Sequence, residues 1–186
     1  MEVGLVTMSS QGAPARWSAP DGRWTEPDLH LFPQDGHRYE IVDGGLHVTP
    51  PMGAEHDATV AALIEALRAD APEGWWVCDR CGIDTGTSNV VPDITVLRPR
   101  STGRIWADPA DVALVVEVES TETSRYDRLL KPAVYAAAGI PAYWRVEGGQ
   151  KLHTFTLDGD GYRAAETVEG AEPVRLDTPY PMRLKL

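Results

Sequence analysis

The feature that most constrains this chain is the placement of acidic residues inside short apolar, β-branched segments. Asp93 ends the run Val91-Pro92-Asp93, and Glu117 lies within Val115-Val116-Glu117-Val118-Glu119-Ser120. Such runs are typical of buried strands, where a carboxylate costs several kcal/mol unless a cation or hydrogen bonds compensate it. Neighbouring carboxylates also repel one another and take up protons. A divalent metal relieves both problems, so the pattern predicts a metal site built on a sheet.

The length and composition indicate one soluble domain. The chain has 186 residues, of which 42% are apolar and 24% charged, which is ordinary for a globular protein. Residues 1–22 are rich in Ser, Gly, Pro and Ala, so we expect a disordered tail there and a single domain over 23–186. No apolar run reaches the roughly 18 residues of a membrane helix. The N-terminus lacks a basic segment followed by an apolar core, which favours the cytoplasm.

The net charge of -11 argues against a simple nucleic-acid binder, because phosphate contacts require Lys and Arg. It argues less strongly against a nuclease. A bound metal supplies positive charge at the place where the reaction needs it.

The chain pattern predicts a mixed α/β domain around a central sheet. Thr25 is suited to cap a short helix that ends near Pro33, and Gly44-Gly45 is suited to turn a β-hairpin over 39–48. Further elements are predicted from hydrophobic periodicity: helices over 55–69 and 128–138, and strands over 75–83, 91–97, 112–119, 143–146 and 152–157.

The strand pattern sets the geometry of the acids. Side chains two apart on a strand share a face, so Glu117 and Glu119 point the same way. If the strands of Asp93 and Glu117 are neighbours, their carboxylates can converge and bind Mg²⁺, which uses one or two carboxylates together with water. The alternative is that these acids lie on the solvated face of an edge strand.

Lys131 is the cation best placed to serve such a site. It follows Asp127 by one helical turn and can pair with it, and a lysine beside two carboxylates can orient water or stabilise a pentavalent phosphate. Pro132 is tolerated only in the first helical turn, so the helix is expected to begin near Lys131 if not at Asp127. The alternative is an exposed surface lysine.

The two cysteines, Cys78 and Cys81, form a C-x-x-C motif without a second pair. On the predicted strand, residues three apart point to opposite faces, so the sulfurs are not expected to converge. We interpret them as two reduced thiols.

Taken together, the motifs resemble the Uma-two family, a bacterial group within the PD-(D/E)XK nuclease superfamily. The resemblance covers about residues 25–157. The matching segments are Tyr39-Glu40-Ile41-Val42-Asp43-Gly44, Glu55-His56, Val91-Pro92-Asp93, Leu114 to Ser120, Asp127 with Lys131, and Tyr135 to Trp144.

The resemblance implies a restriction-endonuclease-like fold, with a mixed central β-sheet flanked by helices and a metal site at a split in the sheet. Asp93 and Glu117 match the family's metal ligands, and the backbone carbonyl of Val118 would join them. Glu119 occupies the position that holds lysine in the wider superfamily. The role of that lysine would pass to Lys131.

Two further residues acquire auxiliary roles through the resemblance. Glu40 corresponds to an acidic residue before the core that could touch a second metal. His56 would act as a base or support the metal ligands; the alternative is a histidine at a helix start satisfied by backbone or solvent.

The resemblance therefore implies an endonuclease that uses Mg²⁺ or Mn²⁺ to hydrolyse DNA phosphodiester bonds and that acts as a homodimer. Two rivals remain open. One is a binding or regulatory protein that keeps the nuclease fold without cutting, and the other is a purely structural dimer.

Overall fold

The computed structural model describes residues 17–19, 21–99, 105–119, 128–170 and 172–186. Most of the tail predicted over 1–22 lies outside these residues, and so does Asp127, whose pairing with Lys131 stays a prediction. Within the described ranges, no helix combines the length and the apolar character needed to cross a membrane.

A β-hairpin near the N-terminus forms as predicted, with its turn one residue earlier. Strands β1 (Arg38–Val42) and β2 (Gly45–Thr49) pair antiparallel, and Gly45 is already paired with Val42. The turn residues are therefore Asp43 and Gly44, with φ of 49° and 79°. Two successive positive φ values are the requirement of the tight turn that matches strand twist.

The largest sheet is six-stranded and mixed, with the order β11-β10-β9-β8-β6-β3. Its strands are β3 (Trp76–Asp79), β6 (Ile94–Leu97), β8 (Val112–Val118), β9 (Ala142–Glu147), β10 (Lys151–Asp158) and β11 (Gly161–Glu169). The pair β8 and β9 is parallel, whereas β6 and β8 run antiparallel as direct neighbours. The condition set for convergence of Asp93 and Glu117 is thus met.

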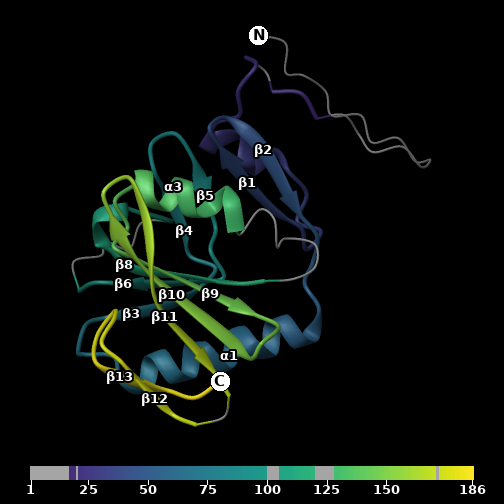
Figure 1. Cartoon of the computed structure of the whole chain (residues 1–186). Helices are drawn as coiled ribbons and strands as arrows, with labels where there is room; N and C mark the ends of the chain where they lie inside the picture. The colour runs from purple at the N-terminus through teal and green to yellow at the C-terminus, as the bar shows by residue number, and fades with distance from the viewer. Residues whose placement is uncertain (1–16, 20, 100–104, 120–127, 171) are drawn as a thin grey trace.

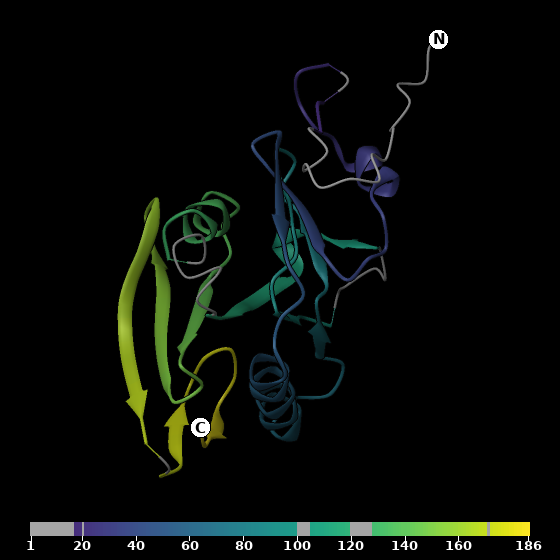
Figure 2. The same cartoon turned by 90° about the vertical axis from the view of Figure 1, so that its right-hand side faces the viewer.

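A second, five-stranded sheet has the order β2-β1-β5-β4-β7. It adds β4 (Gly82–Asp84), β5 (Asn89–Val90) and β7 (Trp106–Ala107) to the hairpin. A separate ribbon pairs β12 (Val174–Leu176) with β13 (Met182–Leu184). In Figures 1 and 2 the hairpin and the strands β9, β10 and β11 lie in different parts of the molecule.

Helices cover both faces of the six-stranded sheet. Helix α1 (Ala54–Ala69) packs Val60, Leu63 and Leu67 against one face, and the short helix α3 (Lys131–Ala137) packs Tyr135 against the other. The 3-10 helices η1 (Glu26–Leu31) and η2 (Pro109–Asp111) complete the described elements. This architecture confirms the predicted mixed α/β class with a central sheet flanked by helices (Figure 1).

The strand predicted over 75–83 is divided between the two sheets. Arg80, with φ of 50°, breaks it, so that β3 ends at Asp79 and β4 begins at Gly82. The strand alternation on which the predicted divergence of Cys78 and Cys81 rested therefore does not hold, and the neighbouring Cys81 thiol lowers the pKa of Cys78. Both are free cysteines, as interpreted from the sequence.

Asp93 also lies outside a strand, although the sequence predicted one from Val91 to Leu97. Strand β6 begins at Ile94, so Asp93 is the last residue of the link that carries the chain from one sheet to the other. Its carbonyl accepts a hydrogen bond from the Arg80 amide at 3.1 Å. The two crossings between the sheets are therefore tied together beside the predicted site.

Candidate functional site

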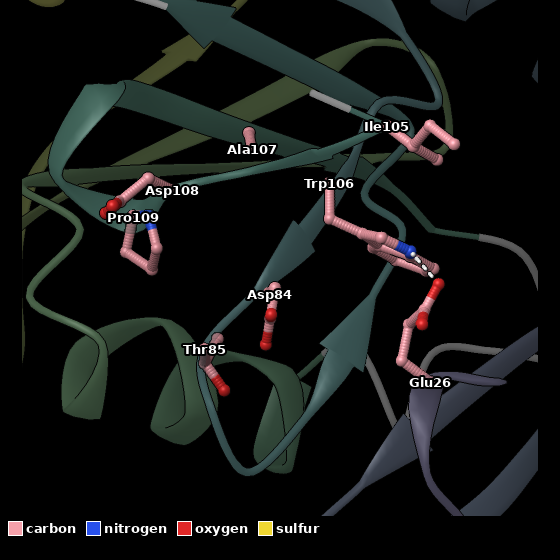
Figure 3. A pocket seen from close by; sticks show the side chains of 8 residues that line it. All are labelled: Glu26, Asp84, Thr85, Ile105, Trp106, Ala107, Asp108 and Pro109. Carbon is pink, nitrogen blue, oxygen red and sulfur yellow. Dashed lines mark hydrogen bonds between the residues drawn. The ribbon is translucent and has the colours of Figure 1, made fainter. Parts of the chain in front are cut away.

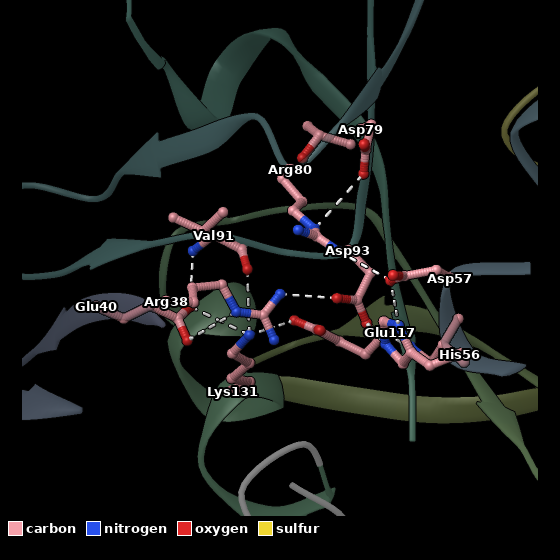
Figure 4. A network of polar contacts seen from close by, with 12 residues as sticks. Arg38, Glu40, His56, Asp57, Asp79, Arg80, Val91, Asp93, Glu117 and Lys131 are labelled. Carbon is pink, nitrogen blue, oxygen red and sulfur yellow. Dashed lines mark hydrogen bonds and ion pairs between the residues drawn. The ribbon is translucent and has the colours of Figure 1, made fainter. Parts of the chain in front are cut away.

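Five ionisable side chains from different elements form one buried cluster (Figure 4). They are Glu40 on β1, His56 on α1, Asp93 before β6, Glu117 on β8 and Lys131 at the start of α3. Glu40, Glu117 and Lys131 have no exposed surface, Asp93 is 1% exposed and His56 8%. The alternatives of a solvated edge strand, a surface lysine and a solvent-satisfied histidine were therefore wrong.

The alternation of β8 explains why Glu117 faces this cluster. Leu114 and Val116 pack into the core under α1, whereas Val115 packs into the second core with Tyr135. Glu117 lies two residues after Val115 and shares its face. Its side chain consequently points toward α3, between the two sheets.

Lys131 joins two of the carboxylates. Its ammonium nitrogen lies 2.9 Å from Oε1 of Glu117 and 3.1 Å from Oε1 of Glu40. The hydroxyl of Tyr135, one turn further along α3, also donates to Oε1 of Glu117. Helix α3 begins at Lys131 with Pro132 in its first turn, as one of the two sequence interpretations expected. The ammonium reaches the acids from that position.

Asp93 is held by three donors. Its Oδ1 accepts a hydrogen bond from Nη1 of Arg38 at 2.7 Å, and its Oδ2 accepts one from the backbone amide of Val118 at 2.9 Å. Nε2 of His56 lies 3.2 Å from the same Oδ2. Because the amide belongs to the residue after Glu117, this contact fixes Asp93 directly beside the end of β8.

The electrostatics of the cluster keep Asp93 ionised. Burial alone would raise the pKa of its carboxyl, but the His56 hydrogen bond and the charges of Arg38 and Lys131 outweigh burial and hold that pKa well below its ordinary value. Burial lowers the pKa of His56, and the hydrogen bond and charge of Asp93 overcome this and raise it. The site thus favours an aspartate beside a readily protonated imidazole.

Arg38 was missed by the sequence interpretation. Its side chain is only 14% exposed and, besides binding Asp93, has Nε 3.7 Å from Oε2 of Glu40. It lies one residue before the hairpin predicted over 39–48, and the available signal was its spacing from Glu40, since residues two apart on a strand share a face. Arg38 and Glu40 stand in that relation on β1.

A chain of ion pairs connects the buried cluster to the surface. Nδ1 of His56 lies 3.4 Å from Oδ1 of Asp57, which accepts a hydrogen bond from Nη2 of Arg80 at 3.0 Å. Asp57 and Arg80 are about half exposed. The imidazole therefore bridges an exposed carboxylate and the buried Asp93, and it is oriented from both sides (Figure 4).

Glu119 makes a different set of contacts. Both of its carboxylate oxygens accept hydrogen bonds from Arg128 at 2.7 Å, and Nε of Arg145 lies 2.9 Å from Oε1. Its side chain is 5% exposed. The negative charge at this position is thus compensated by two arginines, and Glu119 does not face bulk water.

The donor atoms of the cluster are of the kind that binds a divalent metal, but their present arrangement does not form a complete metal site. Asp93 and Glu117 offer hard oxygen ligands next to one another, as Mg²⁺ and Mn²⁺ prefer, and two carboxylates with water suffice for Mg²⁺. However, the described part of the chain contains no group of three or more His, Cys, Asp or Glu residues arranged to hold a metal. Arg38 and Lys131 contact the carboxylates instead.

A hollow of about 530 Å³ lies elsewhere, along β4 and β7 (Figure 3). It is lined by Glu26, Asp84, Thr85, Ile105, Trp106, Ala107, Asp108 and Pro109. The indole of Trp106 donates to Glu26 at 3.0 Å across it. Its lining contains none of the five clustered side chains, and its acids have no cation among the lining residues. The buried cluster is therefore the better candidate for chemistry.

Comparisons with known proteins identify the family and the fold of the chain. The model of the family Uma2, described as "Putative restriction endonuclease", matches residues 26–186. A crystal structure from Anabaena variabilis ATCC 29413, titled as a putative nuclease belonging to DUF820, superposes with a TM-score of 0.64. It covers 82% of this chain and 88% of its own at 13% identity, so this likeness shows the fold alone. A comparison with curated proteins found no match.

Proposed function

Because the chain belongs to the Uma2 family of restriction-endonuclease-like proteins, we propose that it is an endonuclease that uses Mg²⁺ or Mn²⁺ to hydrolyse DNA phosphodiester bonds. The observation that carries the proposal is the burial of Asp93, Glu117 and Lys131 in one cluster, each brought from a different element. Each of these buried charges costs several kcal/mol to desolvate, and clusters of such groups concentrate at functional sites.

In the proposed site, Asp93 and Glu117 hold the metal, and the backbone carbonyl of Val118 completes the protein ligands. When bound, the metal would polarise the phosphate and make a coordinated water more acidic. Glu117 is already fixed by Lys131 and Tyr135, and Asp93 by His56 and the Val118 amide. These contacts support a preorganised pair of carboxylates.

Lys131 is proposed to orient the attacking water or to stabilise the charge that develops on the phosphate. Its side chain is fully buried, so its charge acts in a medium of low dielectric, where it is most effective. The supporting roles go to His56, which orients Asp93, and to Glu40, which shares the Lys131 ammonium. We further propose that a homodimer cuts the two strands.

Calorimetry with MnCl₂ tests the metal site. Wild type is expected to bind Mn²⁺, and Asp93→Asn to lose binding, while the control Asp79→Asn, about 59% exposed at the end of β3, keeps it. If wild type binds no divalent cation at millimolar concentration, the metal-dependent proposal fails. Incubation of plasmid and single-stranded DNA with the metal-loaded protein then identifies the substrate, with Glu117→Gln as the inactive reference.

A second candidate is a binding or regulatory protein that retains the nuclease fold without cutting. The contact that favours it is the one between Arg38 and Asp93, which places a cation on a proposed metal ligand. DNA binding without any cleavage at saturating Mn²⁺ would support this reading over the first.

A further inference from the structure

The two oxygens of Asp93 have different neighbours, and the difference singles out Arg38. Oδ2 accepts hydrogen bonds from the Val118 amide and faces Nε2 of His56. Oδ1 is the oxygen left for an additional ligand, and Nη1 of Arg38 holds it at 2.7 Å. A metal bound to Asp93 through Oδ1 would therefore need the position that the guanidinium now occupies.

Glu40 offers the guanidinium a second position. Its Oε1 accepts from the Val91 amide at 2.7 Å and pairs with Lys131. Its Oε2 and Nε of Arg38 are both buried and, among the described residues, neither makes a hydrogen bond. The two atoms lie 3.7 Å apart, so an approach of about 1 Å would form a normal hydrogen bond.

Unsatisfied buried donors and acceptors are costly, and a charged pair left slightly too far apart is unusual in a packed interior. Arg38 makes a short, charge-assisted contact with Asp93, whereas its distance to Glu40 is too long for a hydrogen bond. The guanidinium of Arg38 thus lies between two carboxylates, from β1 and from the segment before β6, and binds the one of Asp93 more closely.

We propose that Arg38 is a two-position cation that exchanges with the metal: it binds Asp93 in the metal-free protein and moves onto Glu40 when a divalent cation binds Asp93. This inference rests on the proposed function, since it takes Asp93 as a metal ligand. It assigns Glu40 to receiving Arg38, as a positioning residue, and not to a second metal. It also explains how the cluster stays compensated without metal, because its three carboxylates then face Arg38, Lys131 and the imidazole.

The test is calorimetry with MnCl₂ on wild type, Arg38→Met, Glu40→Gln and the double variant. Arg38→Met removes the competing cation and is expected to tighten Mn²⁺ binding by about tenfold or more, as loss of a close charge contact in a buried site does. Glu40→Gln is expected to weaken binding several-fold, because Arg38 then has no anion to move to. In the Arg38→Met background, Glu40→Gln should have no further effect.

The control is Arg80→Met, which removes a positive charge near the cluster from a side chain that binds Asp57 and not the Asp93 carboxylate. It is expected to change the affinity less than threefold. If Arg38→Met leaves the affinity unchanged or weakens it, the exchange is wrong. If Glu40→Gln weakens Mn²⁺ binding equally in both backgrounds, Glu40 is itself a ligand and its assignment as the receiver of Arg38 is wrong.

If Arg38→Met does not fold, the proposal can be tested by NMR on the wild-type protein. The ¹⁵N–¹H signal of Arg38 Nε should shift on addition of Mg²⁺ as its new hydrogen bond to Glu40 forms, and an unmoved signal at saturation overturns the proposal. Absence of Mn²⁺ binding from both wild type and Arg38→Met overturns the metal part of the proposed function and this inference with it. Equal binding by the two overturns this inference alone.

Discussion

The ammonium nitrogen of Lys131 lies 2.9 Å from Oε1 of Glu117, and neither side chain has any exposed surface. The pair joins the first residue of α3 to the central strand β8. Breaking a buried pair by removing one partner leaves the other charge without compensation, which is far more costly than losing a surface contact. Lys131 is therefore expected to affect both stability and catalysis.

Lys131→Met should destabilise the protein by about 3 kcal/mol, because Glu117 and Glu40 would then share a buried space without their common cation. Urea denaturation measures this loss. DNA cleavage should fall by about 100-fold, the usual scale for removal of one charge-stabilising group. Lys151→Met, whose side chain on β10 is about 40% exposed and lies outside the cluster, should change neither quantity. An active and fully stable Lys131→Met variant would remove this lysine from the site.

Much of this arrangement follows from strand alternation. The alternation along β8 places Glu117 on the same face as Val115, two residues earlier. This local rule predicts the face of Glu117, but it left open whether that face is buried beside a neighbouring strand or solvated at a sheet edge; the structure shows that it is buried. The same local rule would have found Arg38 as well, had the strand predicted from Tyr39 been extended by one residue toward the N-terminus.

Other features depend on contacts between distant segments and could not be predicted. The positive φ at Arg80 divides one predicted strand between two sheets, and no glycine marks that position. The compensation of Glu119 by Arg128 and Arg145 depends on residues 9 and 26 positions later in the chain. Strand periodicity gives the face of Glu119 but says nothing about which cations reach that face.

The depressed pKa of Asp93 predicts how stability depends on acid. A carboxyl whose pKa is lower in the folded state stabilises the protein fully above its unfolded value, here 3.8. That contribution is lost as the pH falls below 3.8 toward the folded pKa. The urea midpoint of wild type should therefore drop steeply in this range, and Asp93→Asn should lack that part of the drop. Parallel curves for the two proteins would contradict the prediction.

The raised pKa of His56 predicts the opposite dependence at higher pH. A histidine whose pKa is raised on folding contributes its stabilisation fully below its unfolded value, here 6.5, and loses it as the pH rises through the folded pKa. Wild type should thus lose stability as the pH rises above 6.5, whereas His56→Gln should be flatter. The control is His30→Gln, about 71% exposed on η1, whose curve should follow wild type. A His56→Gln curve with the wild-type slope would show that another group titrates.

Glu119→Lys would place lysine at the position where the wider superfamily carries it, and it tests whether this chain has moved that role to α3. In the present structure the new ammonium would replace a carboxylate bound by Arg128 and Arg145, leaving three cations together. We expect destabilisation by about 2 kcal/mol or more, since the Arg145 side chain is only about 16% exposed, whereas that of Arg128 is about 42% exposed and partly screened. Urea denaturation should show Glu119→Gln, which keeps an acceptor, to be less affected.

Cleavage by Glu119→Lys in a Lys131→Met background should remain at the background level, because the new ammonium lacks the contacts to Glu117 and Glu40. Recovery of cleavage there would mean that the two positions are interchangeable and that the contacts of Lys131 are not required.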